Sequence, residues 1–251
     1  MSTREDKVNL VDCFSGSLGK DLLGAERPIF DGMVSDVFGF NAVQVGFPQH
    51  DFLAHSRIPN KFVMSELSFG QIQGLPHQNP IKSNSIDLVV LPHGLEFSIN
   101  PHGVVREIER ILVPGGSLVL SAFNPMSLWG VRHLLKKCTV KENGVPTELL
   151  SLWRVKDWLK LLSIEVEAGR WGFYRPPVHS DKWRERFLFM EFAGDRWWPI
   201  LGGVYMLKGV KKVRGMRLSI DRWPFYRSVR PVVGSTHKET AQMIELGGVD
   251  E

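Results

Sequence analysis

Polar residues and glycine follow short apolar stretches at several points of this sequence, as they do where strands lead into ligand-binding loops. The first apolar stretch, residues 42–45, contains Gln44 and ends at Gly46. A nucleotide-binding loop begins in this way, because glycine lets the backbone approach a ligand closely and take a positive φ. Pro48 and His50 stand where such loops repeat glycine. The stretch therefore predicts either a cofactor loop of unusual form or an ordinary turn, and it lacks the G-x-G-x-x-G pattern of nicotinamide dehydrogenases.

Two further apolar stretches end beside groups that can titrate. The second stretch ends at Glu66, and the third, residues 86–91, is followed by Pro92, His93 and Gly94. Histidine has an unperturbed pKa near 6.5, so His93 is a candidate for orienting an acceptor or taking a proton from it. Both residues also suit plain roles, a solvated carboxylate and a loop histidine bonded to the backbone. The sequence leaves these alternatives open.

Metal-ligand spacing is absent. His93, Glu96 and His102 do not match H-E-x-x-H, and we expect them to span a strand–loop boundary rather than one helix face. The cysteines are Cys13 and Cys138, which form neither a zinc-type pair nor a disulfide framework. We therefore expect no metal, and a reducing compartment such as the cytoplasm suits the chain.

Alternating helices and strands must position these loops. The run 88–91 is apolar throughout, which is typical of a strand buried on both faces of a parallel sheet. Residues 101–112 place apolar side chains at helical spacing and charges opposite them. This alternation predicts an α/β three-layer sandwich with a mostly parallel sheet, whose ligands bind at the carboxyl ends of the strands. The expected strands are 42–45, 61–66, 86–91, 117–123, 163–174 and 199–209, and the expected helices are 18–38, 50–56, 101–112, 127–137, 151–163 and 181–192.

Charged residues are distributed unevenly along the chain. The chain has 251 residues and a net charge of +4, and eight Lys or Arg against one acid lie between residues 208 and 230. We therefore expect a body at 1–210 and a flexible tail at 211–251, basic and then acidic. Aromatic residues among those charges make nucleic acid a candidate partner for 208–230. The N-terminus lacks a signal-peptide core, and no apolar run is long enough to cross a membrane.

The block 75–125 closely resembles the core of class I S-adenosylmethionine-dependent methyltransferases, the type-11 group. That group has a Leu-Pro pair, an Asp-led strand, an amphipathic helix ending in Arg and Leu, then Pro-Gly-Gly and a strand. This sequence fills the pattern with Leu75, Pro76, Asp87, Arg110, Leu112, Pro114, Gly115 and Gly116. The wording of 91–101 and the following Ser-Leu-Trp-Gly resembles a small bacterial branch of the group. The resemblance implies a Rossmann-like, mostly parallel seven-stranded sheet with an antiparallel last strand, S-adenosyl-L-methionine as cofactor, and methyl transfer to an unidentified acceptor.

The resemblance also implies roles for single residues. Gly46 would contact the methionine part of the cofactor through its backbone, and Gln44, which replaces the group's acid, would be a polar anchor. Glu66 would bind the ribose diol, because a carboxylate can accept both hydroxyl hydrogens. Gln71 and Ile72 would lie beside the adenine. The methyl end would face Pro92, His93 and Gly94, with His93 the one candidate for a catalytic group.

The rival hypothesis is that the chain has the methyltransferase fold but catalyses no methyl transfer. The rebuilt glycine loop would then belong to a binding or scaffold protein, which contacts nucleic acid through its basic tail. Loss of cofactor binding would favour this rival, and binding that depends on Gly46 and Glu66 would favour the enzyme.

Overall fold

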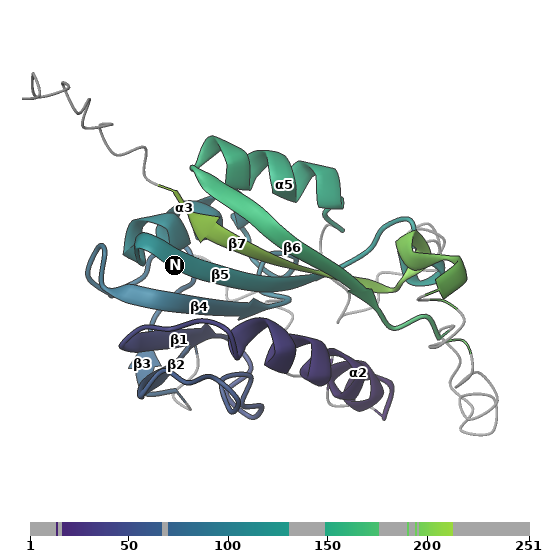
Figure 1. Cartoon of the computed structure of the whole chain (residues 1–251), viewed down its shortest axis with the longest axis horizontal. Helices are drawn as coiled ribbons and strands as arrows, with labels where there is room; N and C mark the ends of the chain where they lie inside the picture. Colours follow the sequence, from purple (N-terminus) through teal and green to yellow (C-terminus); the bar gives the residue numbers. More distant parts are fainter. Residues whose placement is uncertain are drawn as a thin grey trace, which may run out of the picture. The chain divides into compact units, whose positions relative to one another are not determined.

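A seven-stranded sheet forms the centre of the protein (Figure 1). The computed structural model describes residues 14, 17–66, 70–130, 149–175, 190, 194 and 196–212. The strands are β1 (Asn41–Val45), β2 (Asn60–Ser65), β3 (Ile72–Gln73), β4 (Ile86–Pro92), β5 (Leu112–Phe123), β6 (Ile164–Gly172) and β7 (Val204–Lys211). They lie in the order β3-β2-β1-β4-β5-β7-β6. The first five strands pair in parallel, whereas β7 runs antiparallel to β5 and β6, which confirms the predicted fold class.

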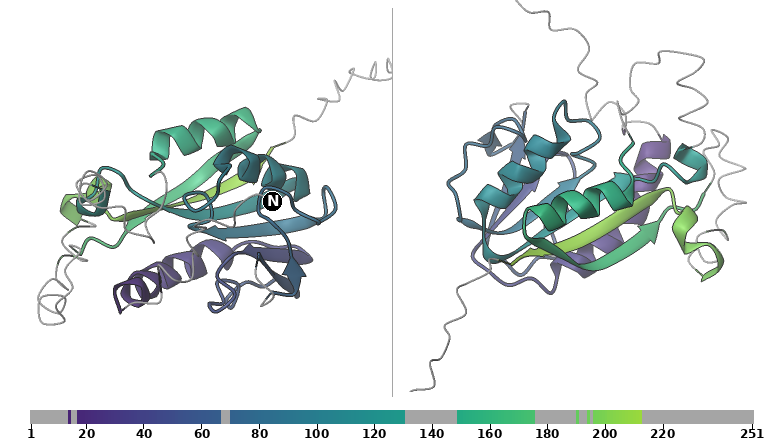
Figure 2. Two further views of the ribbon diagram at one scale, coloured as in Figure 1. Left: turned by 180° about the vertical axis from the view of Figure 1, so that it is seen from behind. Right: turned by 90° about the horizontal axis from the view of Figure 1, so that it is seen from above.

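Helices cover both faces of this sheet (Figure 2). Helix α2 (Ser17–Val34) packs on one face, and α3 (Pro101–Ile111) and α5 (Leu152–Leu161) pack on the other. A short 3-10 helix, η1 (Pro199–Leu201), precedes β7. In β4, Leu88 and Val90 join the core beneath α2, while Val89 and Leu91 join the core beneath α3 and α5. Burial on both faces explains why these strands are apolar without alternation.

The local structure differs from the sequence-based expectation at two connections. Residues 50–56 form turns instead of the expected short helix, and Asp51 Oδ1 accepts a hydrogen bond from the Leu53 N–H at 2.8 Å. The Pro-Gly-Gly sequence lies inside β5 instead of before it, with Gly115 at φ +82°. The pairing register of β4 with β5 shifts between Ile86 and Leu88, so these glycines form an irregularity within the strand. The expected helix 181–192, most of 127–137 and the tail from 213 onward lie outside the described residues.

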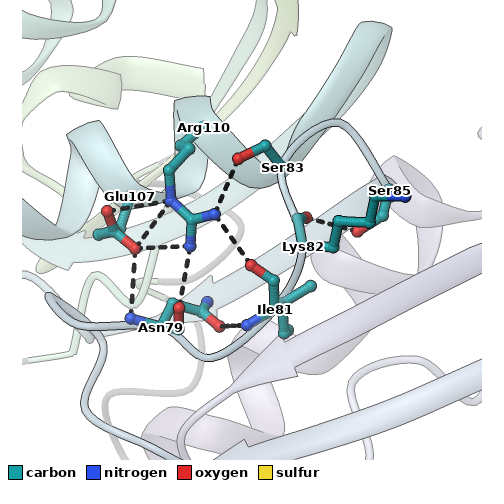
Figure 3. A network of polar contacts seen from close by, with 7 residues as sticks. All are labelled: Asn79, Ile81, Lys82, Ser83, Ser85, Glu107 and Arg110. Carbon is teal, nitrogen blue, oxygen red and sulfur yellow. Dashed lines mark hydrogen bonds and ion pairs between the residues drawn. The ribbon is translucent and has the colours of Figure 1, made fainter.

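Arg110 joins the end of α3 to the chain segment that leads into β4 (Figure 3). Its guanidinium donates hydrogen bonds to the carbonyls of Asn79 and Ile81, both at 2.9 Å, and to the Ser83 hydroxyl at 3.0 Å. The same group pairs with Glu107 at 2.8 Å, which lowers the pKa of that carboxyl. A rigid fork of five donors is needed to reach so many acceptors at once. Arg110 in the family pattern is therefore a structural residue here.

A second family residue is also structural. Asp87 Oδ2 accepts hydrogen bonds from the Phe40 and Asn41 N–H groups, both at 2.9 Å. The carboxylate thereby fixes the start of β1 beside the start of β4. Gly39 makes this possible, because a Cβ at that position would lie 2.3 Å from the Asp87 Cβ.

Lys211 ends β7 with a buried ammonium group. It donates to the carbonyls of Glu109 at 2.6 Å and Leu112 at 2.9 Å and to Asn84 Oδ1 at 3.1 Å. It also pairs with the Glu109 carboxylate at 2.9 Å. These partners precede β4 and β5, so the last described strand ends at the edge of the sheet where the parallel strands begin.

The Arg110 contacts predict a specific loss of stability. We expect Arg110→Met to lower the free energy of unfolding by about 1–3 kcal/mol, because hydrogen bonds to a charged group are lost and two backbone carbonyls lose their donor. Arg106→Met is the matched control, since Arg106 is exposed on the same helix. It should change stability by less than about 0.5 kcal/mol. Urea denaturation followed by circular dichroism measures both, and equal effects would contradict the structural role.

Candidate functional site

The carboxyl ends of β2, β1 and β4 lie side by side in the sheet. The residues predicted to bind the cofactor lie in the loops after these strands, in the last residues of β1 and β4, or at the start of β3. Ligands of open parallel sheets bind at such an edge. We call this place the carboxyl edge.

The loop after β1 is held by the side chain of Gln44. The Gln44 Nε2 group donates to the carbonyls of Gly46 at 3.0 Å, Phe47 at 2.9 Å and His50 at 2.7 Å. Its Oε1 atom accepts from the Phe52 N–H at 2.9 Å. A carboxylate at this position could not donate to three carbonyls. Gln44 therefore draws the loop inward through contacts that the acid of the family cannot make.

Gly46 and Phe47 form the tight turn at the start of this loop. Gly46 has φ +88° and donates its N–H to the Met64 carbonyl at 2.8 Å, which ties the loop to β2. Phe47 follows at φ +48°, a left-handed conformation that is uncommon for a large side chain. Its ring is buried and lies edge-on to the Phe14 ring, with centroids 4.9 Å apart. The aromatic ring thus lies inside the protein, directly after the one glycine that the loop retains.

His93 is fully buried between two carboxylates at the end of β4. Its Nε2 atom lies 2.7 Å from Glu26 Oε1 of α2, and its Nδ1 atom lies 3.1 Å from Glu96 Oε2. Burial alone would lower the pKa of His93, but the charges and hydrogen bonds of both carboxylates outweigh it and raise the pKa to about 10. The imidazole therefore holds both protons at neutral pH and joins α2 to the loop after β4. In this Glu26–His93–Glu96 cluster, no donor within the described part of the chain contacts the second oxygen of Glu26, which is buried.

Aromatic rings enclose this cluster. The ring of Phe14 lies 5.0 Å from the His93 ring, and that of Phe123 lies 4.5 Å away, measured between centroids. The backbone N–H of Phe123 donates to Glu96. Burial, and after it the charge of Glu96, raises the pKa of Tyr205. These surroundings exclude water from the ion pairs and strengthen them.

The ends of β2 and β3 are more open. Glu66 is exposed directly after β2. Gln71 is also exposed, but its Oε1 atom accepts from the Val63 N–H of β2 at 2.6 Å. Ile72 begins β3 and pairs with Met64. Residues 67–69 between them lie outside the described part of the chain.

The sequence-predicted residues therefore divide into two groups. One group, Glu66 and Gln71 at the end of β2, is exposed to solvent. Gln44, Pro92 and His93 are buried, with the His93 ring packed against the Phe14 and Phe47 rings, whereas Gly46 and Gly94 are partly exposed. Sequence reasoning missed Glu26 as a partner of His93. The signal was a glutamate at helical spacing among the apolar residues of α2, whose neighbours Leu22 and Phe30 are buried.

This arrangement tests the fit of S-adenosylmethionine. By the resemblance, the methionine part should contact the backbone of Gly46, but the Gly46 carbonyl already accepts from Gln44. Its methyl end should lie beside His93, where Phe14 and Phe47 are packed. The described conformation therefore does not fit the methionine end, whereas exposed Glu66 suits the adenosine end. No three described His, Cys, Asp or Glu residues could hold a metal, and no helix among the described residues is long and apolar enough to span a membrane.

Comparisons with known proteins agree with the fold. Residues 52–120 match the family model described as "Methyltransferase domain". The Escherichia coli (strain K12) protein "Uncharacterized protein YafS" is 38% identical over 96 residues, which is 38% of this chain and 40% of that protein. The chain thus matches less than half the length of this curated relative.

Solved structures share the architecture at low sequence identity. A SAM-dependent methyltransferase from Thermotoga maritima superposes with a TM-score of 0.56 at 15% identity, covering 80% of this chain and 99% of that one. An S-adenosylmethionine-dependent methyltransferase from Mesorhizobium loti gives a TM-score of 0.53 at 14% identity, covering 78% and 99%. The strand order and these neighbours together show that the chain has the Rossmann-like fold of S-adenosylmethionine-dependent methyltransferases, and residues 52–120 match a methyltransferase domain.

Proposed function

We propose that this protein transfers the methyl group of S-adenosylmethionine to an acceptor molecule. The observation that carries the proposal is the position of Glu66, an exposed carboxylate at the carboxyl end of β2, in a chain with the methyltransferase sheet order. The cofactor's sulfonium supplies the electrophile when it is bound. The acceptor's chemical class is not part of the proposal. Matches to the methyltransferase domain support transfer over the scaffold alternative.

On this proposal, different residues of the chain bind different parts of the cofactor. Glu66 accepts hydrogen bonds from the ribose hydroxyls, and Gln71 and Ile72 border the adenine. Gly46 keeps the turn after β1 close to the ligand, with Gln44 holding that turn from below. Gly94 lets the loop after β4 pass close to Leu91, because a Cβ there would lie 2.3 Å from the Leu91 side chain.

The proposal also requires the methionine end of the site to open. Phe47 has only to turn its ring away from the Phe14 and His93 rings to expose the backbone beside Gly46. The ion pair between Glu26 and His93 opposes a larger opening, because it links α2 to the β4 loop inside the core. We therefore regard the described arrangement as the closed form of the site.

The first prediction concerns the adenosine end. We expect Glu66→Ala to weaken binding of S-adenosylmethionine about 10- to 100-fold, because hydrogen bonds from hydroxyl groups to a carboxylate are lost. Glu167→Ala, which removes an exposed glutamate on β6, is the control and should leave affinity unchanged. Calorimetry measures both. Mass spectrometry of an extract incubated with the protein and methyl-labelled cofactor then tests transfer itself.

The second prediction concerns the closing ring. We expect Phe47→Ala to bind S-adenosylhomocysteine at least about tenfold more tightly than the wild-type protein, because the ring that fills the methionine end is removed. Phe52→Ala removes an equally buried ring of the same core and should bring no gain. Absence of binding by both the wild-type protein and Phe47→Ala at millimolar ligand would refute the proposed function.

The third prediction follows from the raised pKa of His93. The unfolded chain has a histidine pKa near 6.5, whereas the folded value is about 10, so the native state holds one extra proton between these limits. Stability from the charged ring is complete below pH ~6.5 and is lost as the pH rises through ~10. Between pH 7.5 and 9.5, the unfolding free energy should fall by up to about 1.4 kcal/mol per pH unit more steeply than in His93→Gln.

Urea denaturation at constant ionic strength gives these slopes, and identical slopes in the two proteins would contradict the assignment. Should His93→Gln fail to fold, nuclear magnetic resonance of ¹⁵N-histidine in the wild-type protein provides the same test. His93 should then carry protons on both nitrogens at pH 8.

A further inference from the structure

A cavity of about 200 Å³ lies between α2 and the loop after β1. Its wall includes Lys20, Gly24 and Arg27 from the helix and His50 and Asp51 from the loop. The three helix residues are four and three positions apart, so they share one face of α2. Glu26 contacts His93 elsewhere on the helix, and neither residue lines the cavity. The cavity therefore borders the loop after β1 but includes neither His93 nor Glu66.

Positive charge dominates this cavity. Neither Lys20 nor Arg27 forms an ion pair with any carboxylate in the described part of the chain. Burial and the charges of Arg27 and Lys20 lower the pKa of His50, which shows that both cations act on the same space. The Asp51 carboxylate offsets one charge, and its Oδ1 atom is bonded to the Leu53 N–H. Among the residues that line the cavity, the cations thus outnumber the acid.

The walls are fixed on both sides. The carbonyl of His50 accepts from Gln44 at 2.7 Å, which holds the backbone that carries the imidazole. Opposite it, Gly24 leaves the helix surface bare between the two cations, and a Cβ there would meet no atom within 4 Å. Glycine inside a helix costs about 1 kcal/mol relative to alanine. The helix thus leaves open space where most residues would place a side chain.

We propose that this cavity binds the phosphate group of a small metabolite. A guanidinium and an ammonium group that line one cavity suit a phosphate, the first through paired hydrogen bonds and the second as a compact charge. His50 adds a donor next to them, and Asp51 at the margin can accept a hydroxyl of the same ligand. The volume suits a small phosphate ester and not a polymer. The inference does not depend on the proposed methyl transfer.

The test is a titration of ¹⁵N-histidine-labelled, full-length protein with inorganic phosphate and with glycerol 3-phosphate at constant ionic strength. His50 signals are assigned by their absence from His50→Gln. We expect a saturable shift and a higher pKa of His50 when phosphate is bound, with glycerol 3-phosphate binding more tightly. Lys20→Gln and Arg27→Gln should each weaken binding about tenfold, and potassium chloride or acetate at the same ionic strength should not reproduce the shift.

A filled cavity provides the sharpest comparison. Gly24→Leu should place a side chain in the cavity and abolish binding. Gly32→Leu is its matched control, because Gly32 lies on the same helix, also faces open space and does not line the cavity. Both substitutions favour the helix, so both proteins should fold. The inference is overturned if phosphate gives no saturable shift, if chloride gives the same shift, or if the two leucine variants bind equally.

Discussion

The hydrogen bonds of one buried amide determine the shape of the carboxyl edge. Gln44 stands at the end of β1, and its nitrogen and oxygen both bond to the backbone of the following loop. These bonds take the place of a regular helix after β1, since residues 47–59 form turns. They also set where Phe47 and His50 lie, and so connect the closed methionine end with the phosphate cavity. Few side chains other than an amide could make both kinds of contact at once.

The Glu26–His93–Glu96 cluster adds a second constraint. Two carboxylates and one imidazolium leave a net negative charge inside an aromatic enclosure, which is costly unless the pairing is close. The distances of 2.7 and 3.1 Å meet this requirement. Because the partners belong to α2 and to the segment after β4, the cluster joins elements that are distant in sequence. A buried polar group of this kind fixes one arrangement of the helix against the sheet at the expense of easy opening.

The sheet could be predicted from the sequence because a strand that is buried on both faces is a continuous apolar run. Such a run can be seen in the local sequence without knowing which strands lie beside it. Leu88–Leu91 is placed correctly for this reason, and the helix expected at 101–112, which the helical spacing of its apolar residues indicates, is α3. The turns at 50–56 could not be predicted, because they depend on Gln44 and not on their own apolar pattern. The pairing of Glu26 with His93 joins residues 67 positions apart, and no local spacing reveals such a contact. The roles assigned to Glu66, Gln71 and Ile72 stay predictions.

The antiparallel course of β7 has a practical consequence for work with this protein. Its last residue, Lys211, is anchored among Asn84, Glu109 and Leu112 at the amino ends of the parallel strands. A strand of eight residues spans roughly 26 Å, so this anchor lies about one sheet height from the carboxyl edge. Shortening the chain after Lys212, or joining a fluorescent label there, changes the chain at the edge of the sheet opposite the loops around Gly46 and His93. The folded body could then be assayed without the basic segment that follows it.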